Sequence, residues 1–518
     1  MGFTDLSKAK TVAGGSTSVT IESPAISFGE LLTANLKPVA QGDFVYGIQT
    51  PQTFTTASFL GSSVTAANGM AVLNCGTGVS GSAVLNLRRG IKYRPGQGSI
   101  MRATALFDTP VENNLQLIGL ANNETGYSFG YQGTDFGILH RETGQLEIRK
   151  LTITVGATDG ETVTVTLDGD AFSFDIDIDG STSTTQTAYK LSLQDYTQLG
   201  ETGFLVDVIG SDVYFISGRC NPNLTGTYSI SGTNTIAGTF TRVLAGTDYT
   251  ETFIPTGSFN IDKLDGTGDS GMIINPQRGN VYEIDFQYLG FGNARFAVED
   301  PNTGKFINCH MIKNANNRTT PVLKNPNVQI RLESSNNGNT SGVSVRSASM
   351  AGFITGEVVK LDPKFAQSFA FENLNQTTYH PLAMIKTNRI HKNQSCFGEF
   401  DILRLAGSNE VSSKTLIIGF FLGAEITGNV NYQFVNDENS IVSIATLDPT
   451  TNSPPNTISN LSDIVPFHEI VVGPLAGVSE DLDKLEFIFP PGIPLLIAVK
   501  ATNTPVDGSV SINWFEQQ

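Results

Sequence analysis

Short runs of alternating hydrophobic and polar residues fill much of the chain, and turn-forming residues separate the runs. Residues 280–290 alternate along their length, and residues 99–107 alternate along part of theirs. A period of two places one set of side chains on a buried face and the other set in water, as in a half-buried strand. The pattern predicts an all-β, multi-domain protein made of antiparallel β-sandwiches, jelly-roll or lectin-like in form.

One strand-rich pattern occurs in two stretches that are far apart in the sequence, residues 61–150 and residues 257–358. Both stretches combine aromatic and β-branched residues with glycine at the bends, which is typical of sheets. The expected strands lie at 83–88, 99–107, 115–120, 127–140, 280–290, 294–307, 329–333 and 342–346. We interpret the two stretches as one β-sandwich that an insertion splits.

The insertion, residues 151–256, has a pattern of its own. Residues 161–178 indicate two strands joined by the turn Leu167-Asp-Gly-Asp170, which is a hairpin signal. Residues 184–199 are the strongest helix candidate in the chain, and strands follow as far as residue 217. We expect a small inserted α+β module that is rich in strands and carries one helix.

The two ends of the chain differ from each other. Residues 1–60 are polar and interrupted by Gly and Pro, which predicts an extended N-terminal arm that orders against neighbouring molecules. Residues 359–518 hold further strands and predict a C-terminal β-sandwich. Trp514 is the single tryptophan of the chain and lies in the last expected strand, so we expect it to anchor a core.

Composition narrows the function classes. The formal net charge is -17, so the composition shows no basic footprint for nucleic acid, and a charge-separated patch on one face stays open as the alternative. No apolar run reaches the ~18 residues of a membrane-spanning helix, and the N-terminal residues lack the apolar core of a signal peptide. The cysteines, at positions 75, 220, 309 and 396, have no metal-ligand spacing and predict reduced, buried or partly buried thiols.

The glycine-rich string Gly266-Thr-Gly-Asp-Ser-Gly271 fits a dinucleotide-binding pattern and resembles the surroundings of a serine-protease nucleophile. A dinucleotide site needs a helix after the glycines, but residues 272–276 are too short to form one. A protease needs a histidine and a carboxylate beside Ser270, and the sequence around His140 and His310 gives no such context. We therefore expect a plain loop.

The string Asp175-Ile-Asp-Ile-Asp-Gly180 imitates the first half of a calcium-binding loop. Gln186 stands where that loop needs a bidentate glutamate. The favoured interpretation is a strand whose phenylalanine and isoleucine residues face a core while the aspartates face water, and a weak calcium site stays open as the alternative. The aromatic stretches 127–136 and 282–296 have two interpretations as well, a sugar-binding surface or, as we favour, core packing. No catalytic, cofactor-binding or metal-ligating residue is therefore expected.

Several longer strings carry a resemblance. They are Ser27-Phe-Gly-Glu-Leu31, Lys92-Tyr-Arg-Pro-Gly-Gln-Gly98, Arg102–Pro110, Phe129–Ile138, Phe286–Gly292 and Val298–Phe306. Together they resemble poorly characterised virion structural proteins of large double-stranded DNA viruses and tailed phages, over roughly residues 25–358. The resemblance implies a capsid, vertex, spike or fibre component and no established catalytic residues. It covers none of the C-terminal domain.

We therefore expect a non-enzymatic virion structural protein, synthesised in the host cytoplasm, that acts through interfaces with other virion proteins. The alternative is a host-attachment protein that binds a surface glycan, and a polysaccharide-degrading spike enzyme is the least supported. Strand edges need covering, so we also expect a homo-oligomer, with a trimer favoured by analogy. The apolar runs 415–422 and 493–499 are either its interface or simply buried central strands.

Overall fold

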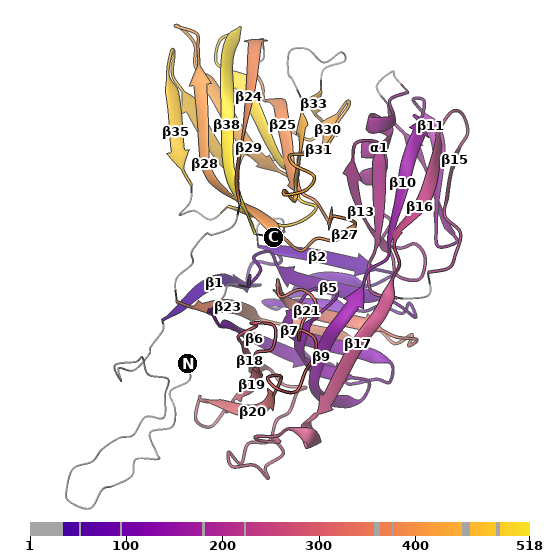
Figure 1. Cartoon of the computed structure of the whole chain (residues 1–518), viewed down its shortest axis with the longest axis vertical. Helices are drawn as coiled ribbons and strands as arrows, with labels where there is room; N and C mark the ends of the chain where they lie inside the picture. The colour runs from indigo at the N-terminus through magenta and orange to yellow at the C-terminus, as the bar shows by residue number, and fades with distance from the viewer. Residues whose placement is uncertain are drawn as a thin grey trace, which may run out of the picture.

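The computed structural model describes residues 35–517 apart from 51–52, 94–95, 179–181, 222–223, 357–362, 376, 448–455 and 483–486. In this part of the chain, antiparallel sheets and a single α-helix form three parts (Figure 1). We call them the N-terminal sandwich (36–145 and 247–355), the helix module (148–244) and the C-terminal sandwich (364–517). The helix module and the C-terminal sandwich lie side by side above the N-terminal sandwich. The predicted all-β fold class is confirmed.

The first sheet of the N-terminal sandwich has nine strands. Its order is β20-β19-β18-β6-β22-β4-β3, with β23 also paired to β6 and β1 paired to β23. The strands are β1 (Leu36–Asp43), β3 (Ser63–Ala67), β4 (Met70–Asn74), β6 (Ser99–Phe107), β18 (Asn280–Phe286), β19 (Ala294–Glu299), β20 (Phe306–Ile312), β22 (Ser344–Ser347) and β23 (Ser349–Thr355).

The second sheet has seven strands in the order β17-β9-β8-β7-β21-β5-β2. They are β2 (Phe54–Phe59), β5 (Ser82–Leu87), β7 (Asn114–Ala121), β8 (Gly126–Gln132), β9 (Asp135–Gln145), β17 (Thr247–Pro255) and β21 (Gln329–Asn336). Each sheet therefore combines strands from before and after the helix module. Every residue of β7 is buried, so this sheet is covered on both of its faces.

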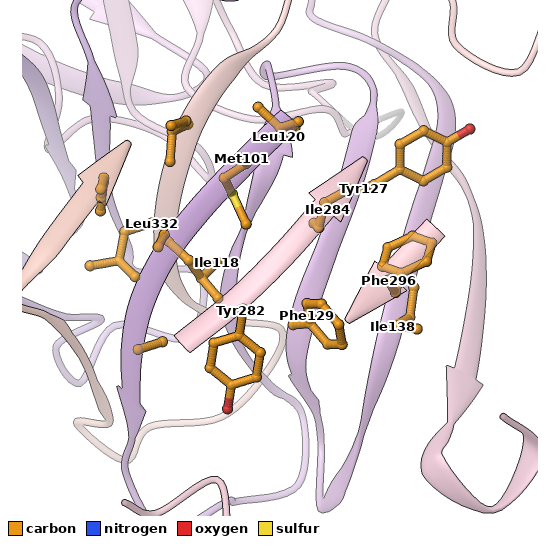
Figure 2. Close-up of a cluster of buried hydrophobic side chains, with 14 of the residues drawn as sticks. Met101, Ile118, Leu120, Tyr127, Phe129, Ile138, Tyr282, Ile284, Phe296 and Leu332 are labelled. Atoms are coloured by element: carbon orange, nitrogen blue, oxygen red, sulfur yellow. The ribbon is translucent and has the colours of Figure 1, made fainter. Parts of the chain in front are cut away.

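Aromatic and aliphatic side chains together fill the space between the two sheets (Figure 2). Phe129 of β8 lies 5.0 Å from Tyr282 of β18 and 5.5 Å from Phe296 of β19, measured between ring centroids. Tyr127, two residues before Phe129, is buried in the same core because alternate residues of a strand share one face. The aromatic stretches 127–136 and 282–296 thus supply core packing, as the favoured interpretation predicted.

The helix module packs two small sheets and one helix around an apolar cluster that extends into the C-terminal sandwich. One sheet contains β10 (Ile148–Val155), β13 (Phe204–Ile209), β14 (Asp212–Ser217) and β16 (Ala237–Leu244), and the other contains β11 (Glu161–Leu167), β12 (Asp170–Ile176) and β15 (Ser229–Gly232). The predicted β11–β12 hairpin is confirmed, and its turn residues Asp168 and Gly169 have φ of 52° and 93°. Such positive φ values are why an Asp-Gly pair suits this turn.

The predicted helix exists but is shorter than residues 184–199. Helix α1 (Thr184–Ser192) begins after Ser183, whose side chain accepts a hydrogen bond from the Gln186 backbone N–H. Tyr196 lies beyond the helix, and its backbone pairs with Phe204 at the start of β13. Pairing with a strand has therefore replaced the last helical turn that the sequence pattern suggested.

The C-terminal sandwich has one five-stranded and one six-stranded sheet. The first contains β24 (Lys364–Leu374), β28 (Glu399–Asn409), β35 (Gly477–Asp481), β36 (Ile488–Phe489) and β38 (Val506–Gln517). The second contains β25 (His380–Thr387), β29 (Leu416–Leu422), β31 (Gln433–Phe434), β32 (Val442–Thr446), β34 (His468–Val472) and β37 (Leu495–Ala501). Two short hairpin-like pairs are β26 (Ile390–His391) with β27 (Gln394–Ser395) and β30 (Ile426–Thr427) with β33 (Thr457–Ile458).

The apolar runs 415–422 and 493–499 become β29 and β37, which pair with each other inside the six-stranded sheet. Their inward side chains, such as Ile418 and Ile497, are fully buried. The structure thus supports buried central strands for these runs and not an exposed interface. Trp514 of β38 is also fully buried in this core, which confirms its predicted place.

Two expected boundaries differ from the observed strands. Of the arm predicted over residues 1–60, residues 1–34 lie outside the described residues, whereas β1 pairs with β23 and β2 pairs with β5 inside the N-terminal sandwich. The module was expected to run to residue 256, but β17 at its end pairs with β9 in the seven-stranded sheet. Both differences arise because the pairing of a strand depends on the order of strands in the whole sheet. The composition of a short segment does not reveal that order.

The helix module and the C-terminal sandwich share one apolar cluster. Phe215 of β14 and Phe421 of β29 both belong to it and are fully or almost fully buried. A buried ion pair crosses the same junction, where the Nζ of Lys386 on β25 bonds to the carboxylate of Asp207 on β13. Lys386 Nζ also donates to the Val208 carbonyl at 2.9 Å.

We predict that Asp207→Asn destabilises the protein by roughly 3–5 kcal/mol, because it leaves the Lys386 ammonium buried without an opposing charge. The free energy of unfolding in urea measures the effect. Asp212→Asn is the matched control, since Asp212 pairs with Lys150 at 3.3 Å in a partly exposed position, where loss of a pair costs about 1 kcal/mol or less. Equal effects of the two substitutions would contradict the prediction.

Candidate functional site

The face of the seven-stranded sheet that points away from the core carries polar and charged side chains, and we call it the outer face. Strand alternation puts Arg141 of β9 and Arg331 and Glu333 of β21 on this face. The loop after β14, which contains Arg219 and Cys220, and strand β17 form further walls. Together they enclose a cavity of about 400 Å³, which we call the outer cavity.

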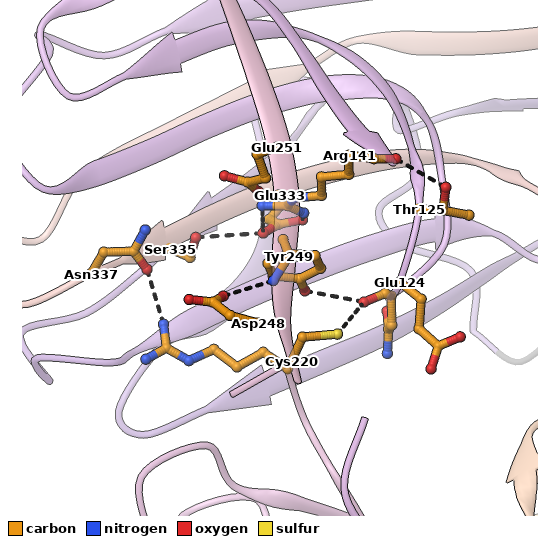
Figure 3. A network of polar contacts seen from close by, with 12 residues as sticks. Glu124, Thr125, Arg141, Cys220, Asp248, Tyr249, Glu251, Glu333, Ser335 and Asn337 are labelled. Atoms are coloured by element: carbon orange, nitrogen blue, oxygen red, sulfur yellow. Dashed lines mark hydrogen bonds and ion pairs between the residues drawn. The ribbon is translucent and has the colours of Figure 1, made fainter. Parts of the chain in front are cut away.

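A network of ion pairs forms the floor of the outer cavity (Figure 3). The Arg141 guanidinium donates to both carboxylate oxygens of Glu333, at 2.9 and 3.3 Å, and its Nε donates to Glu251 at 2.7 Å. Arg331 donates from Nε to Glu333 at 2.9 Å and from Nη1 to the Asn123 side-chain oxygen at 2.6 Å. Glu333 therefore pairs with two buried guanidinium groups, and Glu251 supplies the second negative charge that balances them.

The electrostatics of the network follow from burial and pairing. Burial alone would raise the pKa of the Glu333 carboxyl, but the positive charges of Arg141 and Arg331 outweigh it and lower that pKa to about 2. Burial would likewise lower the pKa of Arg141, and the facing carboxylates of Glu333 and Glu251 hold it well above its ordinary value. Both groups thus keep their charges at every pH at which the protein would normally be studied.

Tyr249 of β17 and Cys220 stand beside these charges. The Arg141 guanidinium carbon lies 4.3 Å from the centroid of the Tyr249 ring, a cation–π contact. The Tyr249 hydroxyl donates to the Asn123 carbonyl at 3.1 Å, and the Cys220 thiol donates to the same oxygen at 3.3 Å. Burial raises the pKa of the Cys220 thiol to about 12, so a reactive thiolate does not form there at neutral pH.

This arrangement suits binding better than proton transfer. A general acid of a glycosidase needs a carboxyl whose pKa is raised toward neutrality, whereas the pKa of Glu333 is lowered. The rim carries hydrogen-bonding groups, among them Asp248 and the Asn337 side chain. Asp248 accepts from the Tyr249 backbone N–H, and Asn337 accepts from Arg219.

The glycine-rich string is a loop, as predicted. Its carboxylate anchor is Asp262, which accepts hydrogen bonds from the backbone N–H groups of Leu264 and Ser270. The Ser270 hydroxyl oxygen accepts from the Met272 backbone N–H at 3.0 Å and so closes a turn. The two histidines bond elsewhere, with His140 Nε2 at 2.9 Å from the Val322 carbonyl and His310 Nδ1 accepting from the Asn260 backbone.

The calcium-like string follows its favoured interpretation as far as Ile176, where β12 ends. Residues 170–176 form β12, in which Phe172 and Phe174 pack against the module core while the Asp175 carboxylate accepts from the Thr162 hydroxyl at 2.6 Å. Residues 179–181 lie outside the described residues. Within the described part of the chain, no three His, Cys, Asp or Glu side chains are grouped as metal ligands would be. All cysteines are unpaired, with Cys75, Cys220 and Cys309 buried and Cys396 partly buried, as predicted.

Among the described residues, none of the helices is long and apolar enough to cross a membrane.

The sequence analysis did not predict the charged network of the outer cavity. One signal was present, because Arg331 and Glu333 are two residues apart in an expected strand and must share a face. The sequence gives no signal for their partner Arg141, which lies 192 residues from Glu333.

No protein-family model matches the chain, and no curated protein matches its sequence. Three solved structures show weak likeness. The carbohydrate recognition domain of Emp47p is 11% identical and covers 62% of this chain and 97% of that domain, with a TM-score of 0.22. The CBM2 module of Dit from Lactobacillus casei BL23 phage J-1 is 9% identical and covers 63% of this chain and 100% of the module, with a TM-score of 0.22. An archaeal virus protein with a triple jelly roll fold is 7% identical and covers 94% of this chain and 97% of its own, with a TM-score of 0.15.

We predict that Glu333 makes the stability of the protein sensitive to acid. Its pKa is about 2 in the folded chain and about 4.3 in an unfolded one. A lowered pKa contributes stability that is complete above the unfolded value and is lost as the pH falls from ~4.3 toward 2. This contribution amounts to about 3 kcal/mol.

Glu333→Gln should therefore be less stable than the natural chain at pH 6, and the gap should narrow as the pH falls below 4. Unfolding in urea at a series of pH values measures the gap. Glu372→Gln, at an exposed position of β24, is the control and should change little at any pH. A gap that stays constant down to pH 2 would show that the carboxylate charge is not what matters.

Proposed function

We propose that this chain is a structural protein of a virus particle, a capsid, vertex, spike or fibre component that acts through protein–protein contacts. The observation that carries the proposal is that buried charges are used to join its parts. Lys386 pairs with Asp207 between the C-terminal sandwich and the helix module. Lys92 lies 3.5 Å from Glu399 between the two sandwiches, and both side chains are less than 10% exposed.

Buried ion pairs of this kind suit a building block better than a reaction site. They add little net stability over apolar contacts, and we infer that in this chain they favour one relative placement of the parts that carry them. Lys92 Nζ also donates to the Phe397 carbonyl at 2.8 Å, so the contact is directional as well as charged. The resemblance of residues 25–358 to virion structural proteins supports the same proposal, with synthesis in the host cytoplasm.

We place the contact between copies of the chain at the free edge of the six-stranded sheet. Strand β34 is the last strand of that sheet, so one side of its backbone has no partner strand among the described residues. Large apolar side chains lie on and beside it, with exposed fractions of 82% for Val465, 55% for Val471 and 67% for Leu475. An open edge with exposed apolar residues favours pairing with another chain. We propose a homo-oligomer, a trimer by analogy with spikes and capsid proteins.

A second function, host attachment through carbohydrate, is compatible with the first. The specific observation that favours it is the outer cavity, where Asp248, Asn337 and other hydrogen-bonding groups surround a space of about 400 Å³. Sugar hydroxyls need such directional partners on a rigid support. The polysaccharide-degrading alternative lacks a comparable observation in the described residues.

The particle role predicts that purified virions of the encoding virus contain the chain. Mass spectrometry should detect it in fixed proportion to other structural proteins, and its copy number should separate an appendage from a shell component. Few copies, at vertices or at a tail, indicate an appendage, and very many indicate a shell. Absence from the particle would contradict the role.

The oligomer proposal predicts that the double variant Val471→Asp, Leu475→Asp shifts the chain from trimer to monomer, because charges at an apolar edge oppose association. Light scattering on the purified 55.4 kDa chain measures the mass. Val155→Asp, on the helix module at a position 44% exposed, is the control and should leave the trimer intact. A natural chain that is monomeric at micromolar concentration would disprove this contact.

A further inference from the structure

A second cavity, of about 290 Å³, lies where all three parts of the molecule meet, and we call it the junction cavity. The N-terminal sandwich contributes the outer face of β2 and β5, the helix module contributes the end of β14, and the C-terminal sandwich contributes segments around residues 389–397 and 490–493. Much of the wall is apolar, including Phe59, Leu205, Ile216, Pro490 and Ile493. The volume is near the lower end of small-molecule sites, which is ~300 Å³.

Unsatisfied polar groups come together at this cavity. Residues Asn86, Arg389 and Ser395 line it. The Asn86 side-chain oxygen, the Arg389 Nε and the Ser395 hydroxyl oxygen are buried and have no hydrogen-bond partner among the residues that the structure describes. Native proteins satisfy nearly all buried polar atoms. Three unsatisfied ones from two different parts of the molecule, around one cavity, indicate a ligand that would supply their partners.

The charge balance beside the cavity is positive. Lys386 and Arg389 are close enough that the charge of Arg389 lowers the pKa of Lys386, in addition to the larger effect of burial. Their one nearby carboxylate, Asp207, is already engaged, because Oδ1 contacts Lys386 Nζ and Oδ2 accepts from the Arg389 backbone N–H at 2.6 Å. Within the described part of the chain, the guanidinium of Arg389 is thus left without a carboxylate of its own.

The backbone is shaped around that guanidinium. Gly492, with φ of +82°, lies so close that a Cβ there would be 2.2 Å from the Arg389 Nη2 atom. Any other residue at this position would displace the guanidinium from the cavity wall. The chain therefore holds an under-neutralised cation in place beside an enclosed space, which is the arrangement that an anionic ligand needs.

We propose that the junction cavity binds a small hydroxylated carboxylate of the acidic monosaccharide class. The carboxylate would accept from Arg389, and the hydroxyl groups would donate to the Asn86 oxygen and exchange hydrogen bonds with Ser395. The apolar C–H face of a sugar ring would lie against the Phe and Pro side chains of the wall. This site is distinct from the outer cavity, and the proposal holds whether or not the chain belongs to a particle.

Isothermal titration of the full chain with D-glucuronate, D-glucose and inorganic phosphate tests the proposal. Glucuronate should bind, with an affinity roughly tenfold or more above those of the other two probes. Glucose binding as tightly as glucuronate would remove the role of the carboxylate and overturn the proposal. Phosphate binding as tightly would overturn the sugar class, because it would show a site for any small anion. Absence of glucuronate binding at millimolar concentration would also overturn it.

Two variants locate the binding. Arg389→Gln should abolish glucuronate binding, and Arg278→Gln, at an exposed position, is its control. Ala57→Phe on β2 should block the cavity without removing a charge, and Ala66→Phe, at an exposed position of β3, is the matched control. Circular dichroism establishes that each variant is folded, and Ala57→Phe decides the matter if Arg389→Gln does not fold. Binding that survives in folded Arg389→Gln or in folded Ala57→Phe would disprove the site.

Discussion

The structure depends on the burial of both faces of the seven-stranded sheet. The inner face is covered by the nine-stranded sheet, and the outer face by the two other parts of the molecule. Burial of a polar sheet face is costly unless each charge meets a partner. The bidentate pairing of Arg141 with Glu333 is one direct result. The outer face can be polar and buried only because it is internally neutralised.

The same constraint explains how the parts are joined. The helix module and the C-terminal sandwich share an apolar cluster, and a buried ion pair between Lys386 and Asp207 crosses it. Where the matching of charges is incomplete, as at Arg389, the mismatch lies at a cavity and not within a packed core. The contacts that join the parts and the candidate binding sites therefore lie in one region, the junction above the seven-stranded sheet. A ligand there would contact all three parts at once.

Much of the fold was predictable because the residue pattern of a strand is visible within a short stretch of sequence. Alternation identified β6 and β18, and the Asp168-Gly169 turn identified the hairpin of the module. The candidate sites were less predictable. The residues next to Arg389 and Asn86 in the sequence give no sign of a binding site. The two residues form a candidate site only because a strand of one sandwich and a loop of the other meet at one cavity. The predicted helix was too long for a similar reason, because the backbone of Tyr196 pairs with Phe204 at the start of β13.

By itself, the sequence determined the β-rich character of the chain, many of its strands, the Asp168-Gly169 turn and which side chains of a strand share a face, because each depends on residues a few positions apart. The tertiary structure alone decided that β17 returns to the seven-stranded sheet, that the runs of β29 and β37 are interior strands, and that Arg141 meets Glu333. These outcomes depend on sheet order. Sheet order is set by the burial of whole faces, and residues separated by more than a hundred positions contribute to each face.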